Sequence, residues 1–165
     1  MPGRPGEGLP EITLNGIVFN GLARCGHIKN EEICIPFPTP HASGIGSSIN
    51  AVTDPWFIGV LLKHRTCDGS SFESMNFERI AEWGLREETP GRCLDSCKTG
   101  FRPYDLAVQC LLLIAKHHLD QRIEVRSGGS DIHWNDQRRL CHAYLGYPLH
   151  EFYIDREAGL IRRFE

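Results

Sequence analysis

Two cysteines stand four positions apart in the stretch "GRCLDSCKTG", residues 91–100. Structural zinc sites use ligand pairs at this kind of spacing, so Cys93 and Cys97 permit a zinc ion. Imidazole is a common further donor, and His117 and His118 are the next candidates along the chain. Neighbouring residues on a helix point about 100° apart, so only one of the two reaches a given metal. The metal-binding hypothesis is therefore a zinc ion held by Cys93, Cys97 and His117.

The rest of the cysteine pattern argues against a metal. A strong zinc signature needs a second cysteine pair at similar spacing, and the chain has none. The C-x2-C spacing of thioredoxin-like redox sites is absent as well. We therefore expect Cys93 and Cys97 to be structural thiols and the protein to bind no cofactor, with zinc as the alternative.

A thiol-based catalytic site is a second candidate for chemistry. A nucleophilic cysteine works with a histidine base and an orienting carboxylate, which the fold brings together from distant positions. The candidates for these three roles are, in order, Cys67, His118 or His133, and Asp136. A chain with seven cysteines and eight histidines offers many such sets. The sequence therefore commits to no catalytic residue.

Charge excludes the usual form of a nucleic-acid-binding surface. The formal net charge is −3, whereas such proteins carry a basic face or stripe. The last 45 residues contain seven arginines and no lysine, but they also contain seven carboxylates. Paired surface charges explain this composition better than phosphate binding does. Nucleic acid is therefore not an expected partner.

Apolar runs are too short for a membrane span. The longest, over 106–115 and interrupted by Gln109, covers ten residues where a transmembrane helix needs about twenty. The first ten residues, "MPGRPGEGLP", lack the apolar region of a secretion signal. We expect a cytoplasmic protein without a membrane partner, in which the odd number of cysteines remains reduced.

The length is that of one domain. The chain has 165 residues, and a domain of roughly 150 residues already buries about two-thirds of the surface that its unfolded form exposes, so no metal or disulfide is needed for folding. The Pro and Gly content of residues 1–10 indicates a flexible lead-in. We expect a single globular domain over 11–165.

Strand signals occur near both ends. Asn15-Gly16 between apolar residues predicts a hairpin over 11–19, because both central turn residues need a positive φ. "EICIPF" predicts a strand over 32–37, and the alternation in "RIEVRS" predicts another over 122–127. "EFYID", "REAG" and "LIRRFE" predict a C-terminal hairpin.

Four helices are predicted between these strands. Asp54 and Pro55 would begin one over "WFIGVLLKHR", and Asn76 would cap a second over "FERIAEWGLREE". The third, from 103 to about 119, is apolar nearly all round, which is typical of a helix buried on several sides. The fourth runs from Ser130 or Asp131 to about Leu145, with Gly146 as its C-terminal cap.

These elements predict an α+β fold. The expected architecture is a mostly antiparallel sheet packed on a central apolar helix at about 103–119, with three further helices. The best functional hypothesis is a non-catalytic soluble domain that acts through protein–protein association or self-assembly, because no catalytic or cofactor motif is present. The alternatives are a metal- or thiol-dependent hydrolase using a Cys/His cluster, and nucleic-acid binding through the Arg-rich C-terminal part.

Overall fold

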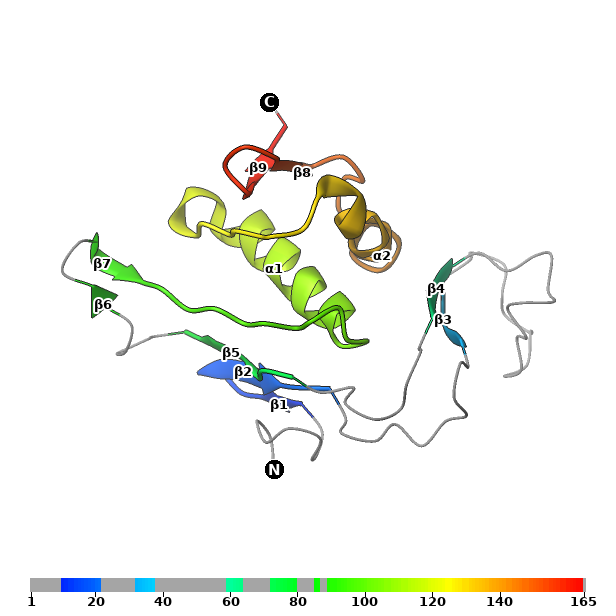
Figure 1. Cartoon of the computed structure of the whole chain (residues 1–165), viewed down its shortest axis with the longest axis horizontal. Coiled ribbons are helices and arrows are strands. Elements are labelled where there is room, and N and C mark those ends of the chain that lie inside the picture. Colours follow the sequence, from blue (N-terminus) through cyan, green and yellow to red (C-terminus); the bar gives the residue numbers. More distant parts are fainter. Residues whose placement is uncertain are drawn as a thin grey trace. The chain divides into compact units, whose positions relative to one another are not determined.

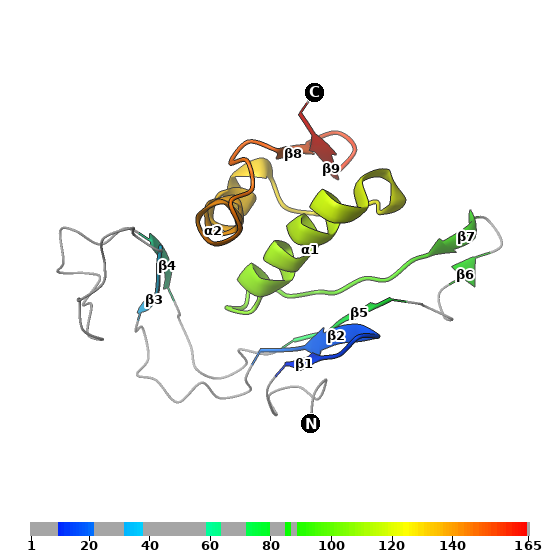
Figure 2. The ribbon, with the colours of Figure 1, turned by 180° about the vertical axis from the view of Figure 1, so that it is seen from behind.

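The computed structural model describes residues 10–21, 32–37, 59–63, 72–79, 85–86 and 89–164. Its chain divides into two compact units, whose elements Figures 1 and 2 show from opposite sides. The N-terminal unit comprises Met1–Glu31 and His64–Asp105, and the C-terminal unit comprises Glu32–Lys63 and Leu106–Glu165. The single domain over 11–165, with its lead-in over 1–10, stays a prediction.

Antiparallel strands form the regular part of the N-terminal unit. A three-stranded sheet has the order β1 (Glu11–Ile12), β2 (Gly16–Phe19) and β5 (Met75–Glu78). A second pair consists of β6 (Leu85–Arg86) and β7 (Thr89–Cys93). The hairpin predicted over 11–19 is confirmed, and the neighbour of β2 on the other side comes from a segment more than fifty residues later.

The turn of this hairpin differs from the predicted one. Ile12 pairs with Ile17, so the turn runs over Thr13–Asn15, and Gly16 already belongs to β2. The Thr13 hydroxyl oxygen accepts the N–H groups of Asn15 and Gly16, at 3.1 and 3.2 Å. Neither Asn15 nor Gly16 has a positive φ. Gly16 is needed for another reason, because a Cβ there would lie 2.8 Å from the Phe77 carbonyl oxygen of β5.

Two of the predicted helices are wrong. Within "WFIGVLLKHR", residues Gly59–Lys63 form β4, which pairs with β3 (Glu32–Pro36) as an antiparallel partner. Asn76, the predicted helix cap, lies in β5 and pairs with Val18. A short apolar run fits a buried strand and a helix equally well, and here the β-partner decides. Apart from the end of β5, Arg79 and β6, the remainder of both predicted helices lies outside the described residues.

Both remaining helix predictions are close to the structure. The first is α1 (Asp105–Leu119), with Lys116, His117 and His118 in its last turn. The second begins as the 3₁₀ helix η2 (Asp131–Trp134), which continues into α2 (Asn135–Leu145). Ser130 caps η2, and Gly146 ends α2 with a φ of 73°. Because this left-handed conformation strains an L side chain, Gly146 has a defined role.

A β-hairpin closes the chain, as predicted. It consists of β8 (Phe152–Asp155) and β9 (Leu160–Arg163). The strand predicted over 122–127 is reduced to an isolated bridge between Arg126 and Leu160, preceded by the 3₁₀ helix η1 (Asp120–Arg122). The predicted alternation of buried and exposed side chains is nevertheless present, since Val125 is buried and Arg126 is exposed. Ile161 donates its N–H to the Val125 carbonyl at 3.0 Å.

The main core of the C-terminal unit lies among its helices, the bridge segment and the final hairpin. Trp134 is 1% exposed, and it is the one large side chain among the described residues that is completely enclosed. It packs in a cluster of buried residues, which are Leu113, Val125, Trp134, Cys141, Phe152, Ile154 and Ile161. This core fixes α1, α2 and the hairpin as one body.

The fold class is mixed α and β with antiparallel sheets, as predicted, but its details differ. The described residues form two α-helices, so three helices beside α1 are not found. They also form several small sheets instead of one sheet packed on a central helix. The apolar surface of α1 is only partly buried, and Ala107 is exposed. Within the described ranges, no helix has the length and apolar character that a membrane span requires.

Candidate functional site

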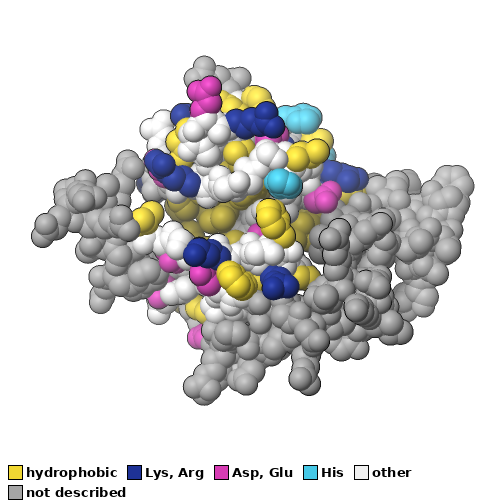
Figure 3. All heavy atoms as spheres, viewed as in Figure 1, with side chains coloured by type: hydrophobic (Ala, Val, Ile, Leu, Met, Phe, Trp, Pro, Cys, Tyr) yellow, Lys and Arg dark blue, Asp and Glu magenta, His cyan; other side chains and the backbone are white. Residues whose placement is uncertain are grey.

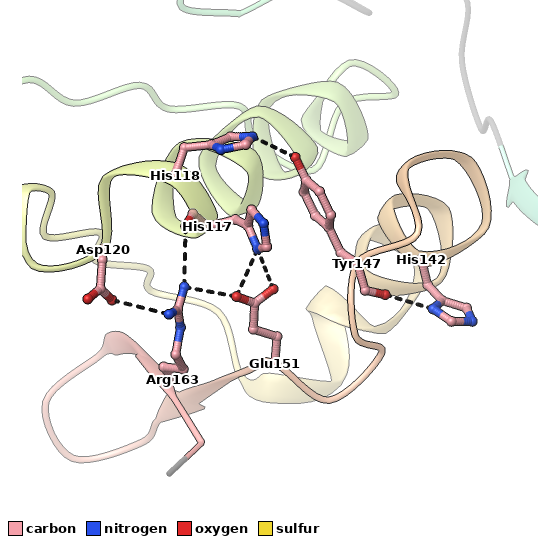
Figure 4. Close-up of polar contacts among 7 residues, drawn as sticks. All are labelled: His117, His118, Asp120, His142, Tyr147, Glu151 and Arg163. Carbon is pink, nitrogen blue, oxygen red and sulfur yellow. Dashed lines mark hydrogen bonds and ion pairs between the residues drawn. The ribbon is translucent and has the colours of Figure 1, made fainter.

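Polar side chains gather at the C-terminal end of α1 (Figure 4). Adjacent residues His117 and His118 come from the last turn of this helix, and Tyr147 follows the glycine that ends α2. His142 of α2 holds this turn, because its Nδ1 lies 2.7 Å from the Tyr147 carbonyl oxygen. Glu151 precedes β8 and Arg163 ends β9. Four segments of the C-terminal unit therefore meet at this point.

A largely enclosed carboxylate is the centre of the cluster. The Glu151 side chain is 10% exposed, and its two oxygens lie 2.8 and 2.7 Å from Nδ1 of His117. Because the carboxylate only accepts, the imidazole carries its proton on Nδ1. The contact therefore fixes the orientation of the imidazole ring, and the second ring nitrogen, Nε2, takes no part in it. Among the described residues, none is hydrogen-bonded to this Nε2.

Arg163 supplies a positive charge to Glu151. Its Nη2 lies 2.9 Å from Oε1 of Glu151, and the same nitrogen donates to the His117 carbonyl oxygen at 3.3 Å. Its Nη1 lies 3.9 Å from a carboxylate oxygen of Asp120, and its guanidinium lies over the Phe152 ring. Arg163 thereby connects the end of α1 with both strands of the hairpin (Figure 4).

Tyr147 covers both histidines. Its ring stacks on His117 with the centroids 3.9 Å apart and the planes 12° from parallel. Its hydroxyl lies 2.9 Å from Nε2 of His118, and the two histidine rings meet edge to face at 4.9 Å. These contacts leave little rotational freedom to His117 or His118. The cluster is therefore rigid, and the charged groups of Glu151 and Arg163 face each other within it.

No comparison with known proteins adds to this geometry. No protein-family model, curated protein or solved structure matches the chain. Its function has to be inferred from its own contacts. A carboxylate that orients an imidazole is compatible with proton transfer at Nε2 and with a structural brace. The stacked Tyr147 and the bridging Arg163 favour the brace, because they add packing and charge balance and no reactive group.

The residues predicted to bind zinc have other partners where they are described. The Cys97 thiol donates to the Glu73 carbonyl oxygen at 3.5 Å, and His117 is held by Glu151. Burial, with the nearby charges of Glu73 and two aspartates, raises the pKa of Cys97 to about 11. A zinc ligand must be a thiolate, so this environment disfavours metal binding. The side chain of Cys93 lies outside the described residues.

No other metal site is apparent in the part of the chain that the structure describes. There, no group of three or more His, Cys, Asp or Glu residues could hold an ion. The zinc hypothesis for Cys93, Cys97 and His117 therefore stays a prediction from the sequence.

The proposed catalytic residues are also engaged elsewhere. Cys67 lies outside the described residues. His118 contacts Tyr147, and Nδ1 of His133 accepts the backbone N–H of Ser130 at 3.1 Å in the cap of η2. Asp136 lies 3.5 Å from Arg139 in the next turn of its helix. The described members of this set thus serve local structure.

Tyr147, Glu151 and Arg163 were not among the candidate residues that the sequence predicted. The adjacent histidines at the end of a helix were its only signal for this cluster. Glu151 lies 34 residues beyond His117, and nothing in its neighbourhood distinguishes it from the other carboxylates of the tail. A pair at this separation becomes visible only when the hairpin is folded against the helix.

The Asp131 side chain connects η2 to β8, and its surroundings predict that the stability of the fold depends on pH. Burial alone would raise its pKa, but hydrogen bonds from Arg138 and the Ile154 amide, with the Arg138 charge, lower it. Because the pKa is lower in the folded chain, the carboxylate stabilises the fold above about pH 4, and this contribution is lost as the pH falls through the folded pKa. Asp131→Asn should therefore flatten the acid side of the stability profile.

The measurement for Asp131 is the urea midpoint of the helical circular dichroism signal between pH 2.5 and 7. Asp136→Asn is the matched control, because Asp136 has only an exposed pair with Arg139. The wild type and the control should lose stability in parallel on acidification, and Asp131→Asn should lose less. Equal slopes for all three proteins would contradict the assignment.

Proposed function

We propose that this protein works by protein–protein association, in which two copies meet through the tip of the β1–β2 hairpin. The observation that carries the proposal is the exposure of Ile12 and Leu14, which are 73% and 91% exposed. They stand two positions apart on one hairpin and so present adjacent apolar side chains to water. Burial of such surface is the main driving force of protein association.

A second copy suits this surface because of the position of β1. Among the described strands, β1 pairs only with β2, so no described strand lies along its other edge. Edge strands of two copies can pair antiparallel about a two-fold axis, which joins the sheets and buries both hairpin tips. The net charge of −3 makes the repulsion between copies small.

The arrangement of charge gives less support to nucleic-acid binding. Five arginines of the C-terminal part form ion pairs, which are Arg126–Glu124, Arg138–Asp131, Arg139–Asp136, Arg162–Asp155 and Arg163–Glu151. Figure 3 shows acidic, basic and apolar side chains interspersed on the described part of one face. Binding to nucleic acid is driven by cationic side chains that neutralise phosphates and so release the counterions condensed on the nucleic acid. Guanidinium groups that already pair with carboxylates neutralise few phosphates. The hydrolase alternative has less support too, since Cys97 remains a thiol at neutral pH.

The test is sedimentation equilibrium of the full chain. The wild type should self-associate, and the double variant Ile12→Ser/Leu14→Ser should raise the dimer dissociation constant at least about tenfold, because each buried aliphatic side chain contributes about 1.5–3 kcal/mol. Ile132→Ser is the matched control. Ile132 has a similar exposure of 70% but lies in the C-terminal unit.

Each outcome of this experiment is informative. A wild type that stays monomeric at several hundred micromolar would overturn the self-association proposal. A dimer that the double variant leaves intact would remove the hairpin from the interface. Loss of the dimer in Ile132→Ser alone would move the interface to the C-terminal unit.

A further inference from the structure

The chain contains two Asn-Gly dipeptides, Asn15-Gly16 before β2 and Asn20-Gly21 after it. Asparagine loses its side-chain amide most readily before glycine, because glycine has no Cβ to hinder the approach of its backbone nitrogen. The reaction needs an asparagine side chain that can turn toward that nitrogen. Since the two dipeptides share the same chemistry, the structure around each of them decides where the reaction occurs.

The Asn15 side chain can make this turn. It is exposed at the tip of the β1–β2 hairpin, and no described residue is hydrogen-bonded to its amide. Only its backbone is held, by an N–H donated to the Thr13 hydroxyl oxygen at 3.1 Å and a carbonyl that accepts the Arg79 N–H at 2.7 Å. The Gly16 N–H donates to the same exposed hydroxyl at 3.2 Å, and water can replace that contact.

The Asn20 side chain is held by four hydrogen bonds. Its Nδ2 donates to the Phe72 carbonyl oxygen at 2.9 Å and to the Ser74 hydroxyl oxygen at 3.1 Å. Its Oδ1 accepts the Phe72 N–H at 3.2 Å and the Gly21 N–H at 2.7 Å. The Gly21 nitrogen thus presents its proton, and not an electron pair, to the amide. Asn20 therefore reacts only after this network opens.

We propose that Asn15 is a site of spontaneous deamidation, and that this change weakens the proposed contact between two copies. The Gly16 nitrogen gives its proton to hydroxide and attacks Cγ of Asn15. The bond from Cγ to Nδ2 breaks, and the leaving nitrogen takes a proton from water and departs as ammonia. A water molecule then opens the succinimide ring at one of its two carbonyls, which gives aspartate or isoaspartate. Ammonia is exchanged for water, and no electron is transferred.

The effect on association rests on the proposed function of the hairpin. Both products place a carboxylate next to Leu14, which is 91% exposed, and add one negative charge to the formal net charge of −3. At a two-fold contact between hairpin tips the new charge lies near its copy, and like charges destabilise such a contact. Isoaspartate also lengthens the main chain before Gly16, which moves the carbonyl that accepts the Arg79 N–H. Deamidation therefore limits the lifetime of the dimer.

The first experiment compares the two dipeptides within the wild-type full chain. The protein is incubated at pH 8 in buffer and, in parallel, in guanidinium chloride, and it is digested with chymotrypsin, whose cleavage after Phe19 separates Asn15 from Asn20. Mass spectrometry measures the conversion of each amide to an acid against an unincubated sample. In buffer, Asn15 should deamidate at least about tenfold faster than Asn20, because an opening free energy of about 1.4 kcal/mol already slows the reaction tenfold.

In guanidinium chloride the two rates should be similar, because the hydrogen bonds of Asn20 are lost. Similar rates in buffer, with the circular dichroism spectrum of the folded chain, would overturn the proposal. Faster reaction of Asn20 than of Asn15 would overturn it equally.

A second experiment measures the effect on association by sedimentation equilibrium. Asn15→Asp carries the added charge from the start, so it should raise the dimer dissociation constant about fivefold at low salt and less at high salt. Asn135→Asp is the matched control, because it adds the same charge in the C-terminal unit. If Asn15→Asp dimerises like Asn135→Asp, deamidation does not regulate the contact. A monomeric fresh wild type would contradict the proposed function and with it this effect, whereas the modification site would stand on the peptide map.

Discussion

Trp134→Ala should lower the free energy of unfolding of the C-terminal unit by about 3–5 kcal/mol, the largest effect of any single substitution proposed for this chain. The reason is the complete enclosure of the indole in the core that joins both helices to the final hairpin. A loss of this size is a large part of the total stability of a typical domain. Urea unfolding followed by circular dichroism at 222 nm measures it, since both α-helices of the described chain belong largely to this unit.

Trp134→Phe is the matched control for this prediction. Phenylalanine keeps an aromatic ring in the core and removes an indole N–H that is buried without a hydrogen-bond partner among the described residues. Loss of an unsatisfied donor offsets part of the lost packing. The Phe variant should therefore cost less than roughly half as much as the Ala variant. Equal costs would mean that the N–H has a partner, and a cost below about 1 kcal/mol for Ala would mean that Trp134 is not enclosed.

Glu151→Ala should lower the free energy of unfolding by about 2–3 kcal/mol. The substitution leaves His117 and Arg163 without their shared acceptor in a partly enclosed site. The effect stays below that of a fully buried pair, because these two side chains are 29% and 42% exposed and water can solvate them. The same urea titration measures it at neutral pH.

Glu151→Gln and Glu157→Ala complete the Glu151 experiment. Glutamine keeps an oxygen that can accept from His117 but loses the charge, so it should cost about half as much as alanine. Glu157 is an exposed carboxylate in the loop of the same hairpin, and its removal should change the stability by less than about 0.5 kcal/mol. If Glu151→Ala behaves like Glu157→Ala, the cluster contributes nothing to the fold.

The sequence predicted those elements that local signals determine. α1 has an acidic first turn, a basic last turn and a long apolar run, and its predicted limits were correct to within two residues. Gly146 was recognised as a cap because its conformation depends only on its own backbone. The hairpin over 11–19 was also found, although its glycine serves the approach of β5 and not the turn.

The elements that the sequence missed depend on distant partners. β4 and β5 read as helices because Val60, Leu61 and Phe77 fit an apolar stripe, and their antiparallel partners lie far away in the chain. The contact of His117 with Glu151 is equally non-local, because 34 residues separate the two. Periodicity describes the face of one element, and it carries no information on which other element covers that face.

The discontinuous N-terminal unit has a consequence for synthesis on the ribosome. β2 ends at Phe19 and its partner β5 begins at Met75, so 56 positions must be translated before the two can pair. At about 5–20 residues per second, the delay is roughly 3–11 seconds. Of the described strands of the N-terminal unit, β1 and β2 alone can pair during that time, and a two-stranded hairpin is marginally stable in water. The hairpin that we propose as the contact between two copies is then exposed on neighbouring nascent chains of one messenger RNA, so we expect the proposed pairing to begin during translation.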